Sequence, residues 1–220
     1  MVRIFCLLIG WVFGLFQTAY FYGKSKGIDI RQHGSGNSGT TNALRVLGTK
    51  AGLIVFAGDC LKCIIAVMIV RFTFGRSNPD IKYLLCLYAA TGVILGHNFP
   101  PYMNFKGGKG IAATAGLITA LHPIFWIPGL LLFFGTFAIT HYVSLGSLLV
   151  YAGLMIQMVI CGQLGVFGEM SQAHLNEMYI LTAFLTIMAY WKHRENIKRL
   201  IGGVERKTYL IKKEDNKTDK

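Results

Sequence analysis

The sequence predicts an all-α polytopic membrane protein with about seven transmembrane helices, some of them short or broken. Hydrophobic residues make up 53% of the 220 residues and charged residues only 15%, which is unlike the composition of an ordinary soluble domain. Apolar runs recur along most of the chain. Basic residues gather in alternate connections between these runs, as they do on the cytoplasmic side of membrane proteins.

Seven apolar runs come close to the ~20 helical residues that cross a ~30 Å hydrocarbon core. The run at 111–121 is the shortest, and its helix would rise only about 17 Å at ~1.5 Å per residue, so we expect a half-helix there. Residues 1–23 are too long for a signal peptide and lack a small-residue cleavage site, so we expect a retained first span. The runs cover residues 4–23, 51–70, 83–96, 111–121, 124–140, 145–162 and 175–191.

The distribution of Lys and Arg predicts the orientation of these helices. Connections 24–50, 97–110 and 192–220 hold five, two and ten basic residues, whereas the opposite side holds four. By the positive-inside rule, we expect the N-terminus outside and the C-terminus in the cytoplasm, which an odd number of spans permits. We expect one membrane domain over 1–205 and a charged cytoplasmic tail over 206–220.

The formal charge of +12 is explained by anionic lipid headgroups, which attract basic residues near the surface by roughly 1 kcal/mol each. We therefore expect membrane lipids, and no nucleic acid, as partners of these residues. Separately, we expect a monomer. Within the first and third runs, Gly10 with Gly14 and Gly92 with Gly96 have the small-xxx-small spacing that lets transmembrane helices pack closely.

A glycine-rich loop between the first two runs has the composition of an anion site. Its glycines allow backbone N–H groups to approach a ligand, and a helix with Arg45 about one turn in follows it. We expect Thr41 to be the N-cap of that helix, and Ser35 and a forked Arg45 to reach a phosphate. The alternative is a turn followed by a capped helix with a snorkelling Arg. Candidate phosphate contacts are Gly34, Gly36, Asn37, Gly39 and Asn42.

Gly34-x-Gly36-x-x-Gly39 formally matches the dinucleotide fingerprint, but that motif needs a preceding strand and a parallel sheet. Here the next helix leads into a membrane span. The sequence also contains neither a Walker-type Gly-x4-Gly-Lys-Ser/Thr nor a Gly-x-Ser-x-Gly elbow. These soluble nucleotide-binding and hydrolase folds are therefore not expected.

A second glycine-rich loop follows the third run. It begins near His97 and contains Lys106 and Lys109, which can converge on one anion because the glycines between them let the backbone fold sharply. The alternative is an interfacial loop whose lysines bind lipid headgroups. The candidate phosphate-binding residues are Lys106, Gly107, Gly108, Lys109 and Gly110, with His97 in support.

The third candidate segment follows the last run. His193 and Asn196 are three residues apart and would share a helix face, and Glu205 could hold one of several nearby cations such as Arg199. The alternative is a basic helix at the membrane edge. Ser144 stands at a predicted helix start on the same side, where it caps that helix or reaches the site.

Asp59 and Lys62 lie within the second apolar run, three residues apart. Charges at that depth are costly unless paired, so we expect a structural ion pair near the site. No Asp, Glu, His or Cys cluster has metal-binding spacing. Neither a metal nor a cofactor is expected.

Together, the three segments resemble the bacterial membrane-integral glycerol-3-phosphate acyltransferases that use acyl phosphate. The matches are Gly34-Ser-Gly-Asn-x-Gly-x-Thr-Asn-x-x-Arg45, Gly96-His97…Phe105-Lys-Gly-Gly-Lys-Gly110 and His193-x-x-Asn196-Ile-x-Arg199-Leu200-x-x-Gly203-x-Glu205, so the resemblance covers about 1–206. Ser38, Thr40, Cys63 and Lys192 depart from the usual family residues. These departures bear on packing and substrate preference more than on activity.

The resemblance implies acyl transfer from acyl phosphate to the 1-hydroxyl of sn-glycerol 3-phosphate at the cytoplasmic face of a bacterial plasma membrane. We expect Ser35 and Arg45 to orient the donor, the two loop lysines to hold glycerol phosphate, and His193, fixed by Asn196, to orient the attacking hydroxyl or take its proton. A covalent Ser35 acyl-enzyme is an alternative step. A transporter or channel for a phosphorylated metabolite is the alternative function, against which stand the lack of repeat symmetry and the placement of all three motifs on one face.

Overall fold

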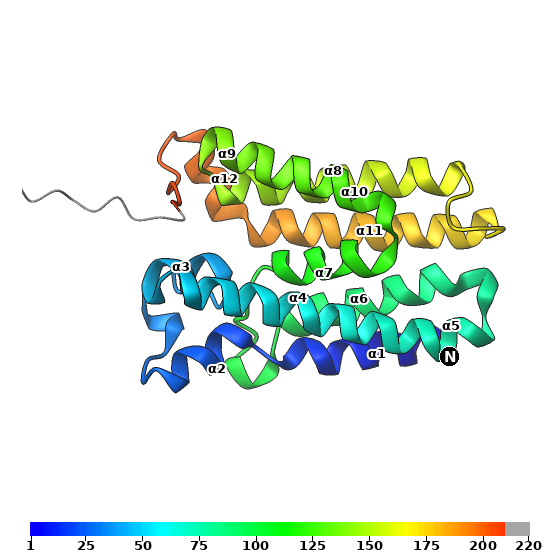
Figure 1. The fold of residues 1–220 in the computed structure, drawn as a ribbon, viewed down its shortest axis with the longest axis horizontal. Coiled ribbons are helices and arrows are strands. Elements are labelled where there is room, and N and C mark those ends of the chain that lie inside the picture. Colours follow the sequence, from blue (N-terminus) through cyan, green and yellow to red (C-terminus); the bar gives the residue numbers. More distant parts are fainter. Residues whose placement is uncertain (210–220) are drawn as a thin grey trace, which may run out of the picture.

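The computed structural model describes residues 1–209, and all regular elements in this range are helices. The longer helices lie side by side along the long dimension of the molecule (Figure 1), with α3 and α12 near one end and the N-terminus and α5 near the other. The predicted all-α class is confirmed. The elements are α1 (Val2–Leu15), α2 (Thr18–Ser25), η1 (Ile30–Gln32), α3 (Thr40–Leu47), α4 (Thr49–Phe72), α5 (Phe74–Ser77), η2 (Pro79–Ile81), α6 (Lys82–Asn98), η3 (Pro101–Met103), α7 (Ile111–Leu121), η4 (Pro123–Phe125), α8 (Trp126–Leu130), the π-helical η5 (Leu131–Gly135), α9 (Thr136–Thr140), α10 (Val143–Gln163), α11 (Gln172–Lys192) and α12 (Arg194–Ile201).

All seven apolar runs are helical, and α7 has the short length expected of a half-helix. Four stretches of the described chain are long and apolar enough to cross a membrane. α6, with 17 residues, and α11, with a polar first turn, are not among them. Membrane-spanning helices are therefore confirmed, while the count of seven and the orientation stay predictions. The four stretches are Val2–Ser25, Thr49–Ser77, Pro123–Thr140 and Val143–Gln163.

The first run is interrupted between α1 and α2, and buried side chains bind the carbonyl groups freed there. Nε2 of the fully buried Gln17 donates to the carbonyl oxygens of Gly14 and His97, both at 3.1 Å. Nζ of Lys62 donates to the carbonyl oxygen of Phe16 at 2.6 Å. Because an unpaired carbonyl in apolar surroundings is costly, these bonds make the break tolerable within a membrane.

Glycines bring α1 and α6 into backbone contact. A Cβ atom on Gly10 would lie 1.8 Å from the carbonyl oxygen of Ala89, and one on Gly92 would lie 2.0 Å from that of Leu7. Only hydrogen fits at these positions. The close packing predicted from the small-xxx-small spacing is confirmed.

The start of α3 corrects one local prediction. The helix begins at Thr40, so its N-cap is Gly39, and no side chain caps it. The prediction of Thr41 as the N-cap is wrong. The first N–H groups of α3 thus have no side-chain oxygen as a cap, which keeps this helix end suited to an anion.

Candidate active site

The three candidate segments meet around one open pocket of about 270 Å³. Asn37 comes from the loop before α3, Lys106 and Lys109 come from the loop before α7, and Arg194 begins α12. Cationic side chains predominate among the polar groups, so the pocket suits an anionic ligand. The lining residues are Asn37, Phe99, Phe105, Lys106, Gly107, Lys109, Trp191, Lys192 and Arg194.

The first glycine-rich loop is held in shape by Asn42. Its Oδ1 accepts a hydrogen bond from the Ser35 backbone N–H at 2.8 Å, and its Nδ2 donates to the carbonyl oxygens of Ile30 and His33. Gly34 has a φ of +64°, a conformation that favours glycine. Asn42 therefore shapes the loop, while Ser35 is exposed. A direct phosphate contact from either side chain stays a prediction.

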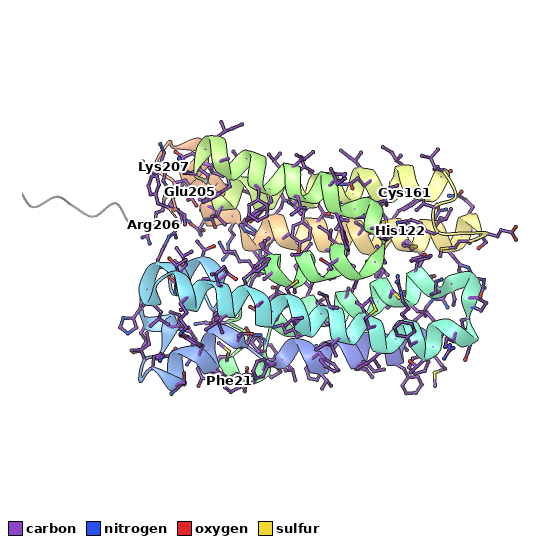
Figure 2. All side chains as sticks on the ribbon, in the orientation of Figure 1. Phe21, His122, Cys161, Glu205, Arg206 and Lys207 are labelled. Carbon is purple, nitrogen blue, oxygen red and sulfur yellow. The ribbon has the colours of Figure 1, made fainter. Side chains whose placement is uncertain are left out.

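Arg45 lies against the segment that follows α12. Its guanidinium donates to Thr208 Oγ1 at 2.7 Å and to the carbonyl oxygen of Arg206 at 3.2 Å. Thr208 is buried, and its backbone N–H donates to the carbonyl oxygen of His141. Figure 2 shows Glu205, Arg206 and Lys207 gathered at this end of the molecule. Arg206 and Thr208 thus contact Arg45, while the rest of the predicted tail, 210–220, lies outside the described residues.

Burial, together with the neighbouring Arg206 charge, lowers the pKa of Arg45 from its ordinary value. The guanidinium nevertheless stays cationic, because an ordinary arginine titrates far above neutral pH. A phosphate that binds beside this partly desolvated cation would stabilise its charge and reduce the repulsion from the neighbouring cation. Arg45 therefore keeps its charge, but it is not among the residues that line the pocket, and its role as an anion ligand stays a prediction.

The second loop folds back onto the end of α6. The N–H groups of Gly107 and Gly108 donate to the carbonyl oxygens of Asn98 and His97 at 3.2 and 3.1 Å. Phe105, just before Lys106, has a φ of +58° and lines the pocket. Such a left-handed conformation is strained for a bulky residue, and strain of this kind gathers at functional sites.

The third segment supplies a buried carboxylate, Glu205, at the centre of a hydrogen-bond network. Its Oε1 accepts from Ser144 at 2.8 Å and from Asn196 at 2.6 Å, and its Oε2 accepts from Arg199 at 2.7 Å. Burial raises the pKa of Glu205, but these hydrogen bonds outweigh burial and hold it below its usual range. Asn196 also accepts a hydrogen bond from Lys109. The second and third segments are therefore directly connected, and Ser144 reaches the site.

Lys109 is an unusually weak base for a lysine. Burial, followed by the positive charge of Arg199, lowers its pKa to about 8. At neutral pH the ammonium is still mostly protonated. A phosphate beside it would replace the solvation that burial removes, so the site favours anion binding at this side chain.

His193 is neutral at pH 7 in a defined tautomer. Its Nδ1 lies 2.8 Å from the carbonyl oxygen of Ala189, which can only accept, so Nδ1 carries the proton and Nε2 the lone pair. Burial, and then the charge of Lys109, lowers its pKa to about 4. Asn196 bonds to Lys109 and Glu205, so the prediction that Asn196 fixes His193 is wrong. The Ala189 carbonyl holds the ring instead.

The predicted ion pair within the second apolar run is confirmed. Lys62 Nζ lies 2.8 Å from Asp59 Oδ1, and both side chains are buried. The same ammonium lies 3.0 Å from His97 Nδ1. The pair therefore adjoins the second glycine-rich loop through His97.

Comparison with known proteins identifies the family. A family model described as "Glycerol-3-phosphate acyltransferase" matches residues 4–203. The chain belongs to the glycerol-3-phosphate acyltransferase family. It is 38% identical over 205 residues to a protein of that name from Clostridioides difficile (strain 630), covering 93% of this chain and 94% of the relative. It is 35% identical over 204 residues to a "Glycerol-3-phosphate acyltransferase" from Bacillus subtilis (strain 168), covering 91% and 95%.

A solved structure of an integral membrane glycerol 3-phosphate acyltransferase, PlsY (YgiH), in its glycerol 3-phosphate form has the same fold. It superposes with a TM-score of 0.80 at 29% identity and covers 94% of this chain and 96% of that one. The lysophosphatidic acid form of PlsY superposes with a TM-score of 0.78. The protein is therefore an acyltransferase integral to the membrane, in agreement with the sequence prediction.

Sequence reasoning missed several residues that line or adjoin the candidate site. Lys192 donates to the carbonyl oxygen of Asn98 at 3.1 Å, and Arg194 lies 4.8 Å from the Trp191 ring centroid. Their positions directly before and after His193 in the sequence could have identified them as candidates. Thr208 gave no signal, because it contacts Arg45 only through the tertiary fold and lies beyond the residues that the family model matches.

Proposed function

We propose that this acyltransferase transfers a fatty acyl group from acyl phosphate to the 1-hydroxyl of sn-glycerol 3-phosphate. The products would be lysophosphatidic acid and inorganic phosphate. One observation carries the proposal: cationic residues from separate segments line one pocket, with Lys106 and Lys109 from the loop before α7 and Lys192 and Arg194 from the junction of α11 and α12. Two phosphate groups repel each other, and a site that brings them together needs such a concentration of positive charge.

The chemical step forms one ester bond and breaks one anhydride bond. The 1-hydroxyl oxygen attacks the donor carbonyl carbon, the bond from that carbon to the phosphate oxygen breaks, and phosphate leaves with the electron pair. The hydroxyl proton passes to a base. With its pKa near 4, His193 is a weak base, so we assign it to accepting a hydrogen bond from the hydroxyl through Nε2 and assign the proton to the departing phosphate.

The remaining residues divide between the two substrates. Lys106, Lys109 and the N–H groups of the glycines between them would hold glycerol phosphate. Arg45, Ser35 and the first glycine-rich loop would orient the donor phosphate and carbonyl. The acyl chain would lie along the apolar helices, where each buried methylene contributes about 0.8 kcal/mol. A covalent acyl-Ser35 step is the competing route, and acyl-labelled donor would then leave label on the denatured protein.

The proposal includes the location of the enzyme. Seven spans with the N-terminus outside would place both glycine-rich loops and the chain after α11 on the cytoplasmic face of a bacterial plasma membrane. The excess of basic residues in those connections supports this orientation. We further propose that the enzyme is a monomer, with its two substrates and the surrounding lipids as its partners.

The test uses the detergent-solubilised protein with sn-glycerol 3-phosphate and each of three donors, namely acyl phosphate, acyl-coenzyme A and acyl-carrier protein. We expect phosphate release and lysophosphatidic acid in equal amounts with acyl phosphate alone. Product from a thioester with none from acyl phosphate would overturn the donor assignment. Arg45→Ala is the matched control, because it should lose both products together. Turnover without membrane compartments would also exclude transport as the explanation.

A further inference from the structure

A buried polar cluster lies beneath the second glycine-rich loop, inside the helical bundle. Asp59 and Lys62 on α4 and His97 on α6 are 1%, 5% and 3% exposed. Thr18 Oγ1 donates to Asp59 Oδ1 at 2.9 Å. Ionisable groups are costly to bury in a membrane protein, and those that are present usually contribute to function.

The hydrogen bonds of Lys62 determine the tautomer of His97. The ammonium has three protons, and three close partners surround it: Asp59 Oδ1 at 2.8 Å, the Phe16 carbonyl oxygen at 2.6 Å and His97 Nδ1 at 3.0 Å. An ammonium only donates, so His97 Nδ1 must accept. Asp59 Oδ1 lies 3.7 Å from His97 Nδ1, which is too far for a hydrogen bond. The neutral His97 ring therefore carries its proton on Nε2.

The ammonium of Lys62 bonds to buried protein groups, although its side chain also borders an apolar hollow. Its side chain lines an apolar hollow of about 430 Å³ between α1 and α4, together with residues such as Val12 and Leu61. Its Nζ instead bonds within the buried cluster. The hydrogen bonds of the ammonium are thus made to protein groups within the bundle.

The opposite edge of the His97 ring supports the loop. A Cβ atom on Gly108 would lie 2.1 Å from His97 Nε2, so the ring packs directly under that glycine. The Gly108 N–H donates to the His97 carbonyl oxygen, which also accepts from Gln17. Lys106 and Lys109 flank the glycines that rest on this ring. The direction of the ring therefore affects where both ammonium groups are held.

We propose that Lys62 is a positioning residue for the phosphate-binding loop. It fixes His97 in the Nε2–H tautomer and in one ring orientation, and His97 in turn fixes Gly107 and Gly108. Asp59 is the counter-ion that keeps Lys62 charged within the bundle. This inference rests on the proposed role of the second loop in holding glycerol phosphate.

The test compares Lys62→Met with the double variant Asp59→Asn/Lys62→Met. The single variant leaves Asp59 buried without its partner, so it should lower both thermal stability and activity. The double variant removes both charges and should recover most of the stability. If Lys62 positions the loop, the KM for glycerol 3-phosphate stays raised by about tenfold in the double variant, because small displacements of binding groups are costly. Lys50→Met, an exposed change on the same helix, should behave as wild type.

Three outcomes overturn the inference. These are a double variant with the wild-type KM, a single variant with unchanged kinetics, or a change in kcat with no change in KM. Nitrogen-15 NMR of histidine-labelled protein provides a readout that does not depend on turnover. The wild type should show His97 as the Nε2–H tautomer, and the double variant should lose that preference. Were the wild type inactive with the proposed substrates, the proposed function would fail while the NMR comparison still tested the tautomer.

Discussion

The lowered pKa of Lys109 predicts a distinctive loss of activity in mild alkali. With a pKa of about 8, the side chain is about 90% protonated at pH 7 and about 10% protonated at pH 9. Only the ammonium form binds phosphate through charge. Because the pKa is depressed, binding competence is present below pH 8 and is lost as the pH rises through it. An ordinary lysine would keep its charge to about pH 10.

The magnitude follows from the bond that is lost. A charge-assisted hydrogen bond contributes about 1.5–3 kcal/mol, so Lys109→Ala should lower kcat/KM for glycerol 3-phosphate roughly ten- to hundredfold at pH 7. In the wild type, kcat/KM should fall about tenfold between pH 7 and pH 9, as the protonated fraction of Lys109 does. On the acid side it should fall near pH 6, where the dianion of a phosphate monoester takes up a proton and loses one negative charge.

The assay is initial-rate lysophosphatidic acid formation between pH 5.5 and 10, with blanks for donor hydrolysis. The profile of kcat/KM reports the groups of the free enzyme. Burial also lowers the pKa of Lys192, which lines the same pocket, to about 8. The double variant Lys109→Arg/Lys192→Arg keeps both cations throughout this range and should lose the alkaline decline, whereas Lys50→Arg should retain it. A wild-type profile that is flat to pH 10, or the same decline in the double variant, would refute the reasoning.

The other predictions concern single side chains. His193→Ala should lower kcat by about ten- to a hundredfold at saturating substrates, because the attacking hydroxyl loses its acceptor; a near-normal kcat would remove His193 from the chemical step. Arg45→Lys should raise the KM for the donor about tenfold, since a lysine cannot form the guanidinium fork, and an unchanged KM in the phosphate-release assay would contradict this. Gly10→Ala should lower the thermal unfolding temperature by several degrees, because its Cβ would lie 1.8 Å from the Ala89 carbonyl oxygen. Gly135→Ala, with helical φ and no atom within 4 Å, should not; equal unfolding temperatures for the two variants would show that the predicted clash is relieved.

The helices could be predicted because each depends on local sequence. The grouping of the motifs could be predicted from the basic residues that mark one membrane face and from the family resemblance. Long apolar runs predict membrane-spanning helices directly, and the glycine spacing in α1 and α6 predicts close helix packing. The break between α1 and α2 could not be predicted from hydropathy. It depends on Gln17 and Lys62, and the partners of Lys62 come from elements distant in sequence.

The wrong partner for His193 has a geometric cause. Residues three apart share a face only on one continuous helix. Here α11 ends at Lys192 and α12 begins at Arg194, so His193 stands at the junction of two helices. Its ring turns to the Ala189 carbonyl, while Asn196 extends to Lys109. The sequence pattern identified both residues, but only the tertiary structure shows which groups they contact.

Glu205 explains how the free enzyme holds its cations close together. Burial and neighbouring cations lower the pKa values of Lys109, His193 and Arg45, and the negative charge of Glu205 acts in the opposite direction on all three. Glu205 therefore offsets part of the mutual repulsion of the basic groups. Its own oxygens are occupied by Ser144, by the Asn196 amide and by Arg199, which keeps it from competing for the substrate's hydroxyl. One buried carboxylate offsets only part of the positive charge around it. The remaining positive potential is available to phosphate, so the same arrangement stabilises the empty site and favours anionic substrates.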